Sequence, residues 1–273
     1  MKIAVITGAS SGMGRELALL LDQRIPNIQE LWLIGRRRER LLSLERRLRK
    51  KCRLLSMDLL EPSSFLFYER ALEESGAEIV FLVNAAGFGK IGAVSRLSLS
   101  EQLAMIDLNL RSLTAFCRIS IPYLSEKSRI INFSSAAAFL PQPDFSVYAA
   151  GKSYVLSFSE ALDEELRESG CRVCAVCPGP VRTEFFDVAE RDGQSIAAYK
   201  ILFMARPDRV ARLALRDSVL GKKCSVYGYS MKLFRLLAKL LPHRFFFFLL
   251  REIQRLTGSM DSNSTLSNKR RDP

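Results

Sequence analysis

Short apolar runs alternate with longer segments of helical period along most of the chain. Predicted strands occupy residues 3–7, 31–34, 53–56, 79–84, 129–134, 172–177 and about 223–227. Between most of them, apolar residues recur three and four positions apart, as in residues 14–23, 38–50, 100–124 and 148–169. Buried strands separated by helices are typical of a parallel sheet with both faces covered. We therefore predict an α/β fold with a doubly wound parallel sheet of about seven strands.

The periodic pattern continues to about residue 256 without a linker or an internal repeat, which predicts one domain over residues 1–256. Residues 257–273 are polar and lack an apolar period, so we expect a disordered tail. The amino terminus has an apolar run of only four residues, too short for a signal peptide. The longest apolar run near the other end, 245–250, lies between Arg244 and Arg251 and is too short to span a bilayer. These features predict a cytoplasmic protein.

Six cysteines are present, and three of them form a Cys171-x-x-Cys174-x-x-Cys177-Pro178 run. The run resembles half of an iron–sulfur signature, but no fourth cysteine follows at the needed spacing. The segment also fits a strand, in which side chains three positions apart point to opposite faces. We therefore interpret these cysteines as structural thiols and predict no metal site.

Composition is that of a globular protein, with 48% hydrophobic and 26% charged residues, and it excludes disordered, collagenous and disulfide-scaffold classes. The net charge of +12 is unusual. Two segments account for it, because residues 35–53 carry +8 and residues 231–256 carry +5. The remainder is close to neutral and shows no nucleic-acid docking motif, so we expect no nucleic-acid partner.

The basic segment 231–256 interleaves leucine and phenylalanine with six Lys and Arg residues. A leucine stripe of helical spacing precedes Pro242, and four consecutive phenylalanines, 245–248, follow it. Two interpretations remain open. The segment makes peripheral contact with an anionic membrane, or it covers the substrate pocket or packs on a neighbouring subunit.

A glycine-rich loop follows the first predicted strand, with the spacing G-x-x-x-G-x-G at Gly8, Gly12 and Gly14. Glycines let a backbone approach a pyrophosphate, which is then bound by amide groups at the helix amino terminus. The alternative is an ordinary connection between strand and helix.

The second predicted strand ends in Gly35-Arg36-Arg37-Arg38, where folds that bind NAD place a carboxylate on the ribose. A glycine there removes the repulsion of a 2′-phosphate, and an arginine can bind it with charge-assisted hydrogen bonds. We predict NADP(H) rather than NAD(H), with Arg36 as the phosphate ligand and Arg37 as a weaker candidate. The alternative is that the arginines form the solvated face of helix 38–50.

Candidate acid–base chemistry lies where the fifth predicted strand ends and a helix begins. Tyr148 and Lys152 are four positions apart and share a helix face. An ammonium near a phenol lowers the phenol pKa, which would make Tyr148 a general acid and base near neutral pH. Ser135, at the strand end, can donate a hydrogen bond to a substrate oxygen. The three groups suit interconversion of a carbonyl and an alcohol.

With these motifs in this order, the chain resembles the short-chain dehydrogenase/reductase family over nearly all of residues 1–230. The resemblance implies a Rossmann-type sheet and a catalytic set of Asn109, Ser135, Tyr148 and Lys152. In that set Tyr148 gives the proton, Ser135 holds the carbonyl, Lys152 binds the nicotinamide ribose, and Asn109 supports a proton relay. The implied cofactor contacts are Gly8, Ser10, Ser11, Gly12, Met13, Gly14, Asp58, Leu59, Asn84, Ala85, Gly87, Tyr148, Lys152, Pro178, Gly179, Val181 and Thr183.

The resemblance also implies a homodimer or homotetramer that pairs through helices 100–124 and 148–169. Residues 184–204 correspond to the family's substrate lid, and their Phe, Leu and Met content favours an apolar lipid-like, steroid-like or 3-oxoacyl substrate. We expect an NADPH-dependent oxidoreductase. The alternative is a non-catalytic dinucleotide sensor that docks on a membrane or partner through residues 231–256.

Overall fold

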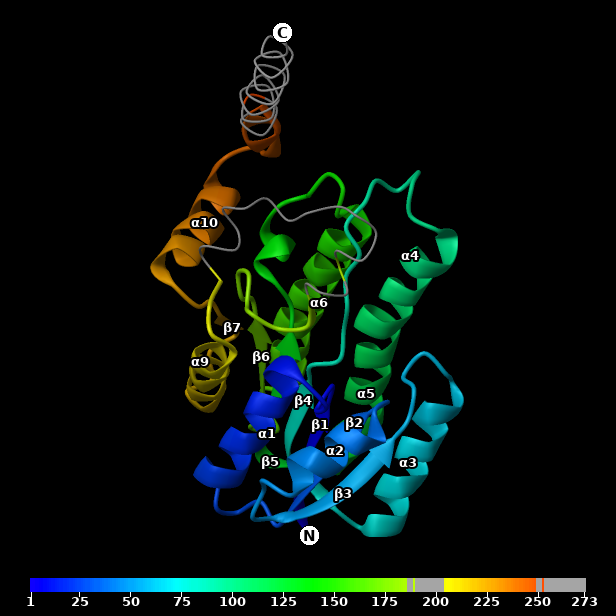
Figure 1. Cartoon of the computed structure of the whole chain (residues 1–273). Helices are drawn as coiled ribbons and strands as arrows, with labels where there is room; N and C mark the ends of the chain where they lie inside the picture. The colour runs from blue at the N-terminus through cyan, green and yellow to red at the C-terminus, as the bar shows by residue number, and fades with distance from the viewer. Residues whose placement is uncertain (186–188, 190–203, 249–251, 253–273) are drawn as a thin grey trace, which may run out of the picture.

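Parallel strands run side by side through the middle of the protein (Figure 1). The computed structural model describes residues 1–185, 189, 204–248 and 252. In this part of the chain the sheet has seven strands in the order β3-β2-β1-β4-β5-β6-β7. The strands are β1 Lys2–Thr7, β2 Glu30–Gly35, β3 Lys51–Ser56, β4 Glu78–Asn84, β5 Leu124–Phe133, β6 Arg172–Val176 and β7 Cys224–Ser225. The predicted doubly wound parallel sheet is therefore confirmed.

Helices cover both faces of this sheet. They are α1 Gly12–Arg24, α2 Arg38–Glu45, α3 Ser63–Ser75, α4 Leu99–Ile106, α5 Ser112–Ser120, α6 Ser146–Glu165, α9 Pro207–Val219 and α10 Tyr229–Leu240. Short turns of 3₁₀ helix lie at Ile121–Tyr123 and Ala136–Phe139, and Asp107–Arg111 forms a π-helical segment between α4 and α5. Residues 243–248 are also helical.

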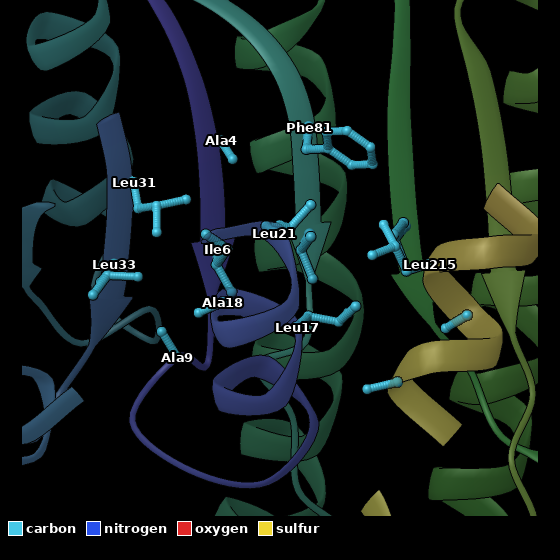
Figure 2. Packing of buried hydrophobic residues seen from close by; sticks show 14 of the residues in the cluster. Ala4, Ile6, Ala9, Leu17, Ala18, Leu21, Leu31, Leu33, Phe81 and Leu215 are labelled. Carbon is cyan, nitrogen blue, oxygen red and sulfur yellow. The ribbon is translucent and has the colours of Figure 1, made fainter. Parts of the chain in front are cut away.

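One core layer lies between the sheet and helices α1, α2 and α9. Leu17, Ala18 and Leu21 of α1 point at alternate residues of β1 and β2, and Leu215 of α9 closes the layer (Figure 2). The opposite face of the same strands packs on α3, α5 and α6. Because both faces are buried, the strands contain apolar runs rather than an alternation of apolar and polar residues.

The helices predicted over 38–50, 100–124 and 148–169 all end earlier in the structure, the last of them at Glu165. Helix α2 ends at Glu45 instead of residue 50, because the buried Asp22 carboxylate accepts hydrogen bonds from the backbone N–H groups of Arg49 and Lys50 at 3.0 and 2.9 Å. The helix predicted over 100–124 ends at Ser120, where a 3₁₀ turn containing Pro122 leads into β5. Strand β5 accordingly begins at Leu124, before the predicted residue 129.

The predicted lid and tail fall mostly outside the described part of the chain. This applies to residues 186–188 and 190–203 of the lid, and to residues 249–251 and 253–273 at the carboxyl end. Within the described ranges, no helix combines the length and the apolar character needed to cross a bilayer.

The three cysteines of the 171–177 run lie in different surroundings. Cys171 packs in the layer formed by α3, α5 and α6, whereas Cys177 packs with Val226 and Met231 at the other end of β6. In the described residues, no group of three or more His, Cys, Asp or Glu side chains could hold a metal ion. The run is therefore part of the core of the sheet.

Candidate active site

The glycine-rich loop lies where β1 ends and α1 begins, against the end of β4. Gly8 and Gly12 have positive φ angles of 67° and 52°. A Cβ atom on Gly8 would lie only 2.7 Å from the backbone nitrogen of Ala86, so only glycine permits this approach. The Thr7 hydroxyl accepts hydrogen bonds from the backbone N–H groups of Ala85 and Ala86 at 3.1 and 3.2 Å. These contacts hold the loop at the point where the strand order reverses, which is where α/β sheets bind ligands.

Helix α1 begins directly on this loop. A Cβ atom on Gly14 would lie 2.5 Å from the carbonyl oxygen of Gly8, so the first turn of α1 packs against the loop without a side chain between them. Ser11 precedes α1 and makes no side-chain cap hydrogen bond. Ser11 therefore does not cap the first N–H groups of α1, and uncapped N–H groups at a helix amino terminus can bind phosphate.

The arginines that follow β2 have different partners. The Arg36 guanidinium lies 3.6 Å from the Asp58 carboxylate. Arg37 instead donates to the hydroxyls of Ser11 and Ser10 at 3.0 and 3.4 Å, and it pairs with the Glu184 carboxylate at 2.9 Å. Arg37, the weaker candidate from sequence, is thus the one that contacts the phosphate loop.

Glu184 receives a second arginine from the start of α2, because Arg40 also hydrogen bonds to its carboxylate. Burial opposes ionisation of Glu184, but the hydrogen bonds from Arg40 and Arg37 outweigh it and hold the pKa of this carboxyl below its ordinary value. The sequence carried no signal for this contact, since 147 residues separate Arg37 from Glu184.

Asp58 and Leu59 lie in the turn after β3 and line the same cavity as Arg36. The Asp58 carboxylate accepts from the backbone N–H of Leu60 at 3.0 Å, and its carbonyl oxygen accepts from the Ser64 hydroxyl at 2.6 Å. Leu59 is buried. These bonds fix the turn, so the Leu59 and Asp58 side chains lie together at this end of the cavity.

Asn84, at the end of β4, lies behind the cavity wall. Its amide donates to Asn132 Oδ1 at 2.9 Å, and Asn132 in turn donates to the Ser159 hydroxyl at 3.0 Å. All three side chains are buried. They link β4, β5 and α6, so Asn84 supports the wall that Ala85 and Gly87 line.

Ser135, Tyr148 and Lys152 converge on one side of the cavity. The Ser135 hydroxyl hydrogen bonds with the Tyr148 phenol and also accepts from the backbone N–H of Ala137 at 3.1 Å. The Lys152 ammonium lies 5.5 Å from the centre of the Tyr148 ring and donates to the carbonyl oxygen of Phe133 at 2.8 Å. Ser135, after the end of β5, thus lines the same cavity as Tyr148 and Lys152 of α6, the arrangement that their spacing in the sequence predicts.

Burial shifts the pKa of Tyr148 and Lys152 in opposite directions. It raises the pKa of Tyr148 above its ordinary value of 10.0, against a smaller lowering from the Ser135 hydrogen bond. It lowers the pKa of Lys152 from 10.5 to about 8. The net shift is thus opposite to the lowering predicted from Lys152, whose effect on Tyr148 stays a prediction. Desolvation disfavours the phenolate more than its neighbours stabilise it.

Asn109 lies in the π-helical segment between α4 and α5. Its side-chain amide makes two hydrogen bonds with the backbone of Phe88. It donates to the Phe88 carbonyl oxygen at 2.8 Å and accepts from the Phe88 N–H at 3.1 Å. A Cβ atom on Gly87 would lie 2.6 Å from Asn109 Oδ1 and 3.6 Å from Lys152 Nζ. The Asn109 amide and the Lys152 ammonium therefore both lie next to Gly87, close to each other. An extra residue in a helix commonly marks a functional site.

The turn after β6 completes the cavity. Its Pro178 carbonyl accepts from the backbone N–H of Ala136, the residue after Ser135, at 2.8 Å. Val181 forms a parallel bridge to Ala205, and a Cβ atom on Gly12 would lie 3.5 Å from the Thr183 methyl group. The turn thus reaches from the catalytic serine to the phosphate loop.

The cavity bounded by these elements has a volume of about 1400 Å³ and runs from Arg36 and Arg37 to Tyr148. Of the predicted cofactor contacts, Gly8, Ser10, Ser11, Gly12, Met13, Arg36, Asp58, Leu59, Ala85, Gly87, Tyr148, Lys152, Pro178, Gly179, Val181 and Thr183 line it. Gly14, Asn84 and Asn109 lie behind its lining. Single small-molecule sites have volumes of ~300–1000 Å³, so this cavity has room for a dinucleotide and a further substrate.

Aromatic side chains surround Tyr148 on the substrate side. Phe145 stacks on its ring at 4.3 Å between centres, and Phe185 lies 5.4 Å away. Gly89 packs against all three rings, because a Cβ atom there would lie within 3.0 Å of each. The sequence did not single out Phe145 or Gly89. The contacts of Gly89 with Phe145 and Tyr148 join segments about 60 residues apart, for which a local pattern gives no signal.

Comparisons with known sequences agree with this arrangement. A family described as short chain dehydrogenase matches residues 2–193. An uncharacterized oxidoreductase of Staphylococcus epidermidis is 30% identical over 217 residues, which cover 77% of this chain and 93% of that protein. Sulfoacetaldehyde reductase 2 of Chromohalobacter salexigens is 33% identical over 233 residues, covering 82% and 91%.

Solved structures share the fold. A short-chain dehydrogenase from Sphingobium yanoikuyae in complex with NADPH has a TM-score of 0.75 and 28% identity, covering 84% of this chain and 88% of that one. The closed form of a serine dehydrogenase complexed with NADP⁺ has a TM-score of 0.72 and 25% identity, covering 83% and 94%.

Proposed function

The chain belongs to the short-chain dehydrogenase family, and from that premise we propose an NADP(H)-dependent oxidoreductase that interconverts a carbonyl and an alcohol on an apolar substrate. The family resemblance seen in the sequence is confirmed, and with it an NAD(P)-dependent dehydrogenase. One observation carries the proposal further. Ser135, Tyr148 and Lys152 share a single cavity with the glycine-rich loop at the end of β1.

The described residues fit a dinucleotide. Gly8 and Gly14 leave no space for a Cβ atom, and the amino terminus of α1 is open to a pyrophosphate. Arg37 and Arg36 would bind a 2′-phosphate, with Arg37 closer to the loop serines. The NADPH and NADP⁺ in the two solved relatives support this choice of cofactor. A bound NADP(H) supplies the hydride.

Proton transfer falls to Tyr148. Because burial raises its pKa, the phenol is protonated at neutral pH and can donate to a carbonyl oxygen. Ser135, which hydrogen bonds with the phenol, would hold the same oxygen. Lys152 would bind the ribose hydroxyls, and Asn109 would connect it to solvent through a relay. This arrangement favours reduction of the carbonyl.

Several observations support the remaining parts of the proposal. Phe145 and Phe185 give the cavity an apolar wall beside Tyr148, which suits a lipid-like, steroid-like or 3-oxoacyl carbonyl compound. Leu103 of α4 and Tyr154 of α6 are exposed, which supports pairing of subunits through these helices in a homodimer or homotetramer. We place the protein in the cytoplasm, with peripheral contact to a membrane.

Replacing the acid tests the reaction. Tyr148→Phe should lower kcat for reduction of an apolar ketone by about 10²–10⁴-fold and leave NADPH affinity within about threefold, because only the proton donor is lost. The measurement is NADPH oxidation across a panel of carbonyl compounds, with Kd from fluorescence titration. Tyr154→Phe, on the same helix and partly exposed, is the matched control and should keep full activity.

Two results would contradict the proposal. Retention of most activity in Tyr148→Phe would remove the assigned acid. Tight NADPH binding by the natural chain with no turnover of any carbonyl in the panel would instead favour a non-catalytic dinucleotide sensor, for which the exposed face of α10 would be the output surface.

A further inference from the structure

Helix α10 has apolar side chains on two opposite faces. Met231, Phe234 and Ala238 face the protein, and Ala238 is buried. On the other side, a stripe of leucines at helical spacing faces solvent. The exposed fractions are 56% for Leu233, 54% for Leu236, 38% for Leu237 and 69% for Leu240. Tyr229, four positions before Leu233, extends this stripe on α10, and Phe245 and Phe248 are exposed in the helical segment that follows Pro242.

Such a continuous apolar stripe is rare on a protein surface that faces only water. We use the term α10 face for its members Tyr229, Leu233, Leu236, Leu237 and Leu240. Helix α10 lies at the edge of the molecule, away from α3 (Figure 1).

The charged side chains of residues 229–248 are all Lys and Arg. Lys232, Lys239 and Arg244 are exposed beside the α10 face, and residues 229–248 contain no Asp or Glu. An acidic side chain reaches this region from α6, where Glu160 lies 3.5 Å from Arg235 on the inner side of α10. Leucines between cations on a helix are typical of segments that lie in the headgroup region of anionic bilayers. A partner surface of apolar residues alone would not explain the cations.

The inner side of α10 forms part of the cavity wall. Met231, Phe234 and Phe246 line the cavity. A Cβ atom on Gly179, in the turn after β6, would lie 2.8 Å from Met231 Sδ. Phe234 packs 6.2 Å from Phe139 and 6.5 Å from Phe246, measured between ring centres. Helix α10 thus exposes leucines to solvent on one face and lines the cavity with its other face.

We propose that the α10 face docks on an anionic lipid bilayer and that apolar carbonyl substrate enters the cavity from that bilayer beside Met231, Phe234 and Phe246. The route of entry rests on the proposed oxidoreductase function, whereas docking on the bilayer does not. Apolar burial of the leucines and attraction of the cations act together, so neither alone holds the protein at the surface.

Vesicle flotation of the full chain tests docking. The protein should float with vesicles of phosphatidylcholine and phosphatidylglycerol in equal parts, and at least about tenfold less with phosphatidylcholine alone, because the cations need anionic headgroups. Leu236→Asp should lower the partition coefficient at least about tenfold, since it removes apolar burial and adds repulsion. Leu66→Asp on α3 is the matched control, with 59% exposure, and should float like the natural chain.

Other occupants of the α10 face give different results. A second copy of the chain would appear in sedimentation velocity as a larger species that Leu236→Asp dissociates, without flotation. Failure of the natural chain to float on anionic vesicles, or equal flotation of Leu236→Asp, would overturn the proposal.

Two substrates separate docking from catalysis. A long-chain ketone carried in anionic vesicles should be reduced at least about tenfold more slowly by Leu236→Asp than by the natural chain. The natural chain should also reduce this ketone faster in anionic vesicles than in neutral ones. A short water-soluble ketone reports turnover without docking. Flotation without turnover of either ketone would leave docking standing and remove the proposed function. Turnover of the short ketone without flotation would leave the proposed function standing and remove docking.

Discussion

Tyr148 and Lys152 lie one helical turn apart on α6, yet burial acts on their protons in opposite senses. The phenol is uncharged when protonated, so desolvation holds its proton and raises its pKa. The ammonium is charged when protonated, so the same desolvation lowers its pKa to about 8. At neutral pH both groups are protonated. In this state Tyr148 can give a proton, as the proposed reduction of a carbonyl requires.

This pair predicts a pH profile for the reduction. The ammonium form of Lys152 predominates below pH about 8 and is lost above it, so kcat/KM should be level near neutral pH and fall about tenfold per pH unit above about 8. Tyr148 does not limit the profile there, because its pKa is raised above 10.0. Steady-state assays in one buffer series at constant ionic strength measure the profile.

Lys152→Met provides the control for this profile. It should be slower at every pH and should show no fall near pH 8, since it has no proton to lose. A fall near pH 8 that persists in Lys152→Met, or a level profile to pH about 10 in the natural chain, would assign the titration to another group.

At the scale of the element, the site depends on how helices begin. The first turn of α1 lies against the carbonyl oxygen of Gly8 because Gly14 has no side chain. A π-helical segment between α4 and α5 displaces Asn109 from regular helical register and brings its amide to the backbone of Phe88. Local backbone geometry, rather than side-chain choice alone, therefore sets where these functional groups lie.

Gly14→Ala tests the contact between α1 and the loop. The added methyl group would lie 2.5 Å from Gly8 O, an overlap with backbone that cannot rotate away. We expect the free energy of unfolding to fall by ~1–3 kcal/mol and NADPH affinity to fall at least about tenfold, because the displaced amides bind the pyrophosphate. Urea denaturation and fluorescence titration measure the two effects.

Gly76→Ala at the end of α3 separates the two effects. Gly76 has a φ of 54° but no atom within 4 Å of an added Cβ, so alanine there brings backbone strain without overlap. It should cost ~1 kcal/mol of stability and leave NADPH affinity unchanged. Equal affinity loss in both variants would show that stability, not loop geometry, controls binding.

At the scale of the whole molecule, the cavity joins parts of the chain that are distant in sequence. Arg37 after β2 pairs with Glu184 after β6, and Met231 of α10 contacts Gly179. A ligand bound to all of these segments binds only the folded chain, so it raises the free energy of unfolding. Cofactor choice is then visible as a difference in Tm.

NADPH should raise Tm by roughly 5–10 °C at about 100 times its Kd, and NADH at the same concentration should raise it less. Arg37→Ala should lower NADPH affinity about 10–100-fold, because charge-assisted hydrogen bonds to the 2′-phosphate are lost. Arg36→Ala should lose less, since the Arg36 side chain is more exposed and it is Arg37 that hydrogen bonds to Ser10 and Ser11. Arg38→Ala is the control with full affinity. Equal stabilisation by NADPH and NADH would contradict NADP(H) as the cofactor. An unchanged preference for NADPH over NADH in Arg37→Ala would contradict Arg37 as a ligand of the 2′-phosphate.

Much of the site could be read from local patterns. Ser135, Tyr148 and Lys152 are brought together by a strand end and one helical turn, and a parallel sheet places its carboxyl ends at one edge. The sequence missed contacts of long range. It ranked Arg36 above Arg37 as the phosphate ligand, which stays a prediction, and it gave no sign that Arg37 hydrogen bonds to Ser10 and Ser11. It also extended α2 to residue 50, since the Asp22 carboxylate that ends it lies on another helix.

The amino-acid sequence by itself determined the parallel sheet, the glycine-rich loop and the spacing of Ser135, Tyr148 and Lys152, because each depends on periodicity or on neighbours within about one turn or one strand. The tertiary structure alone decided the direction of the pKa shifts, the partner of each arginine and the two faces of α10. Desolvation depends on everything that surrounds a group. Folding buries Met231 and Phe234 and leaves the neighbouring leucines of the same helix in solvent.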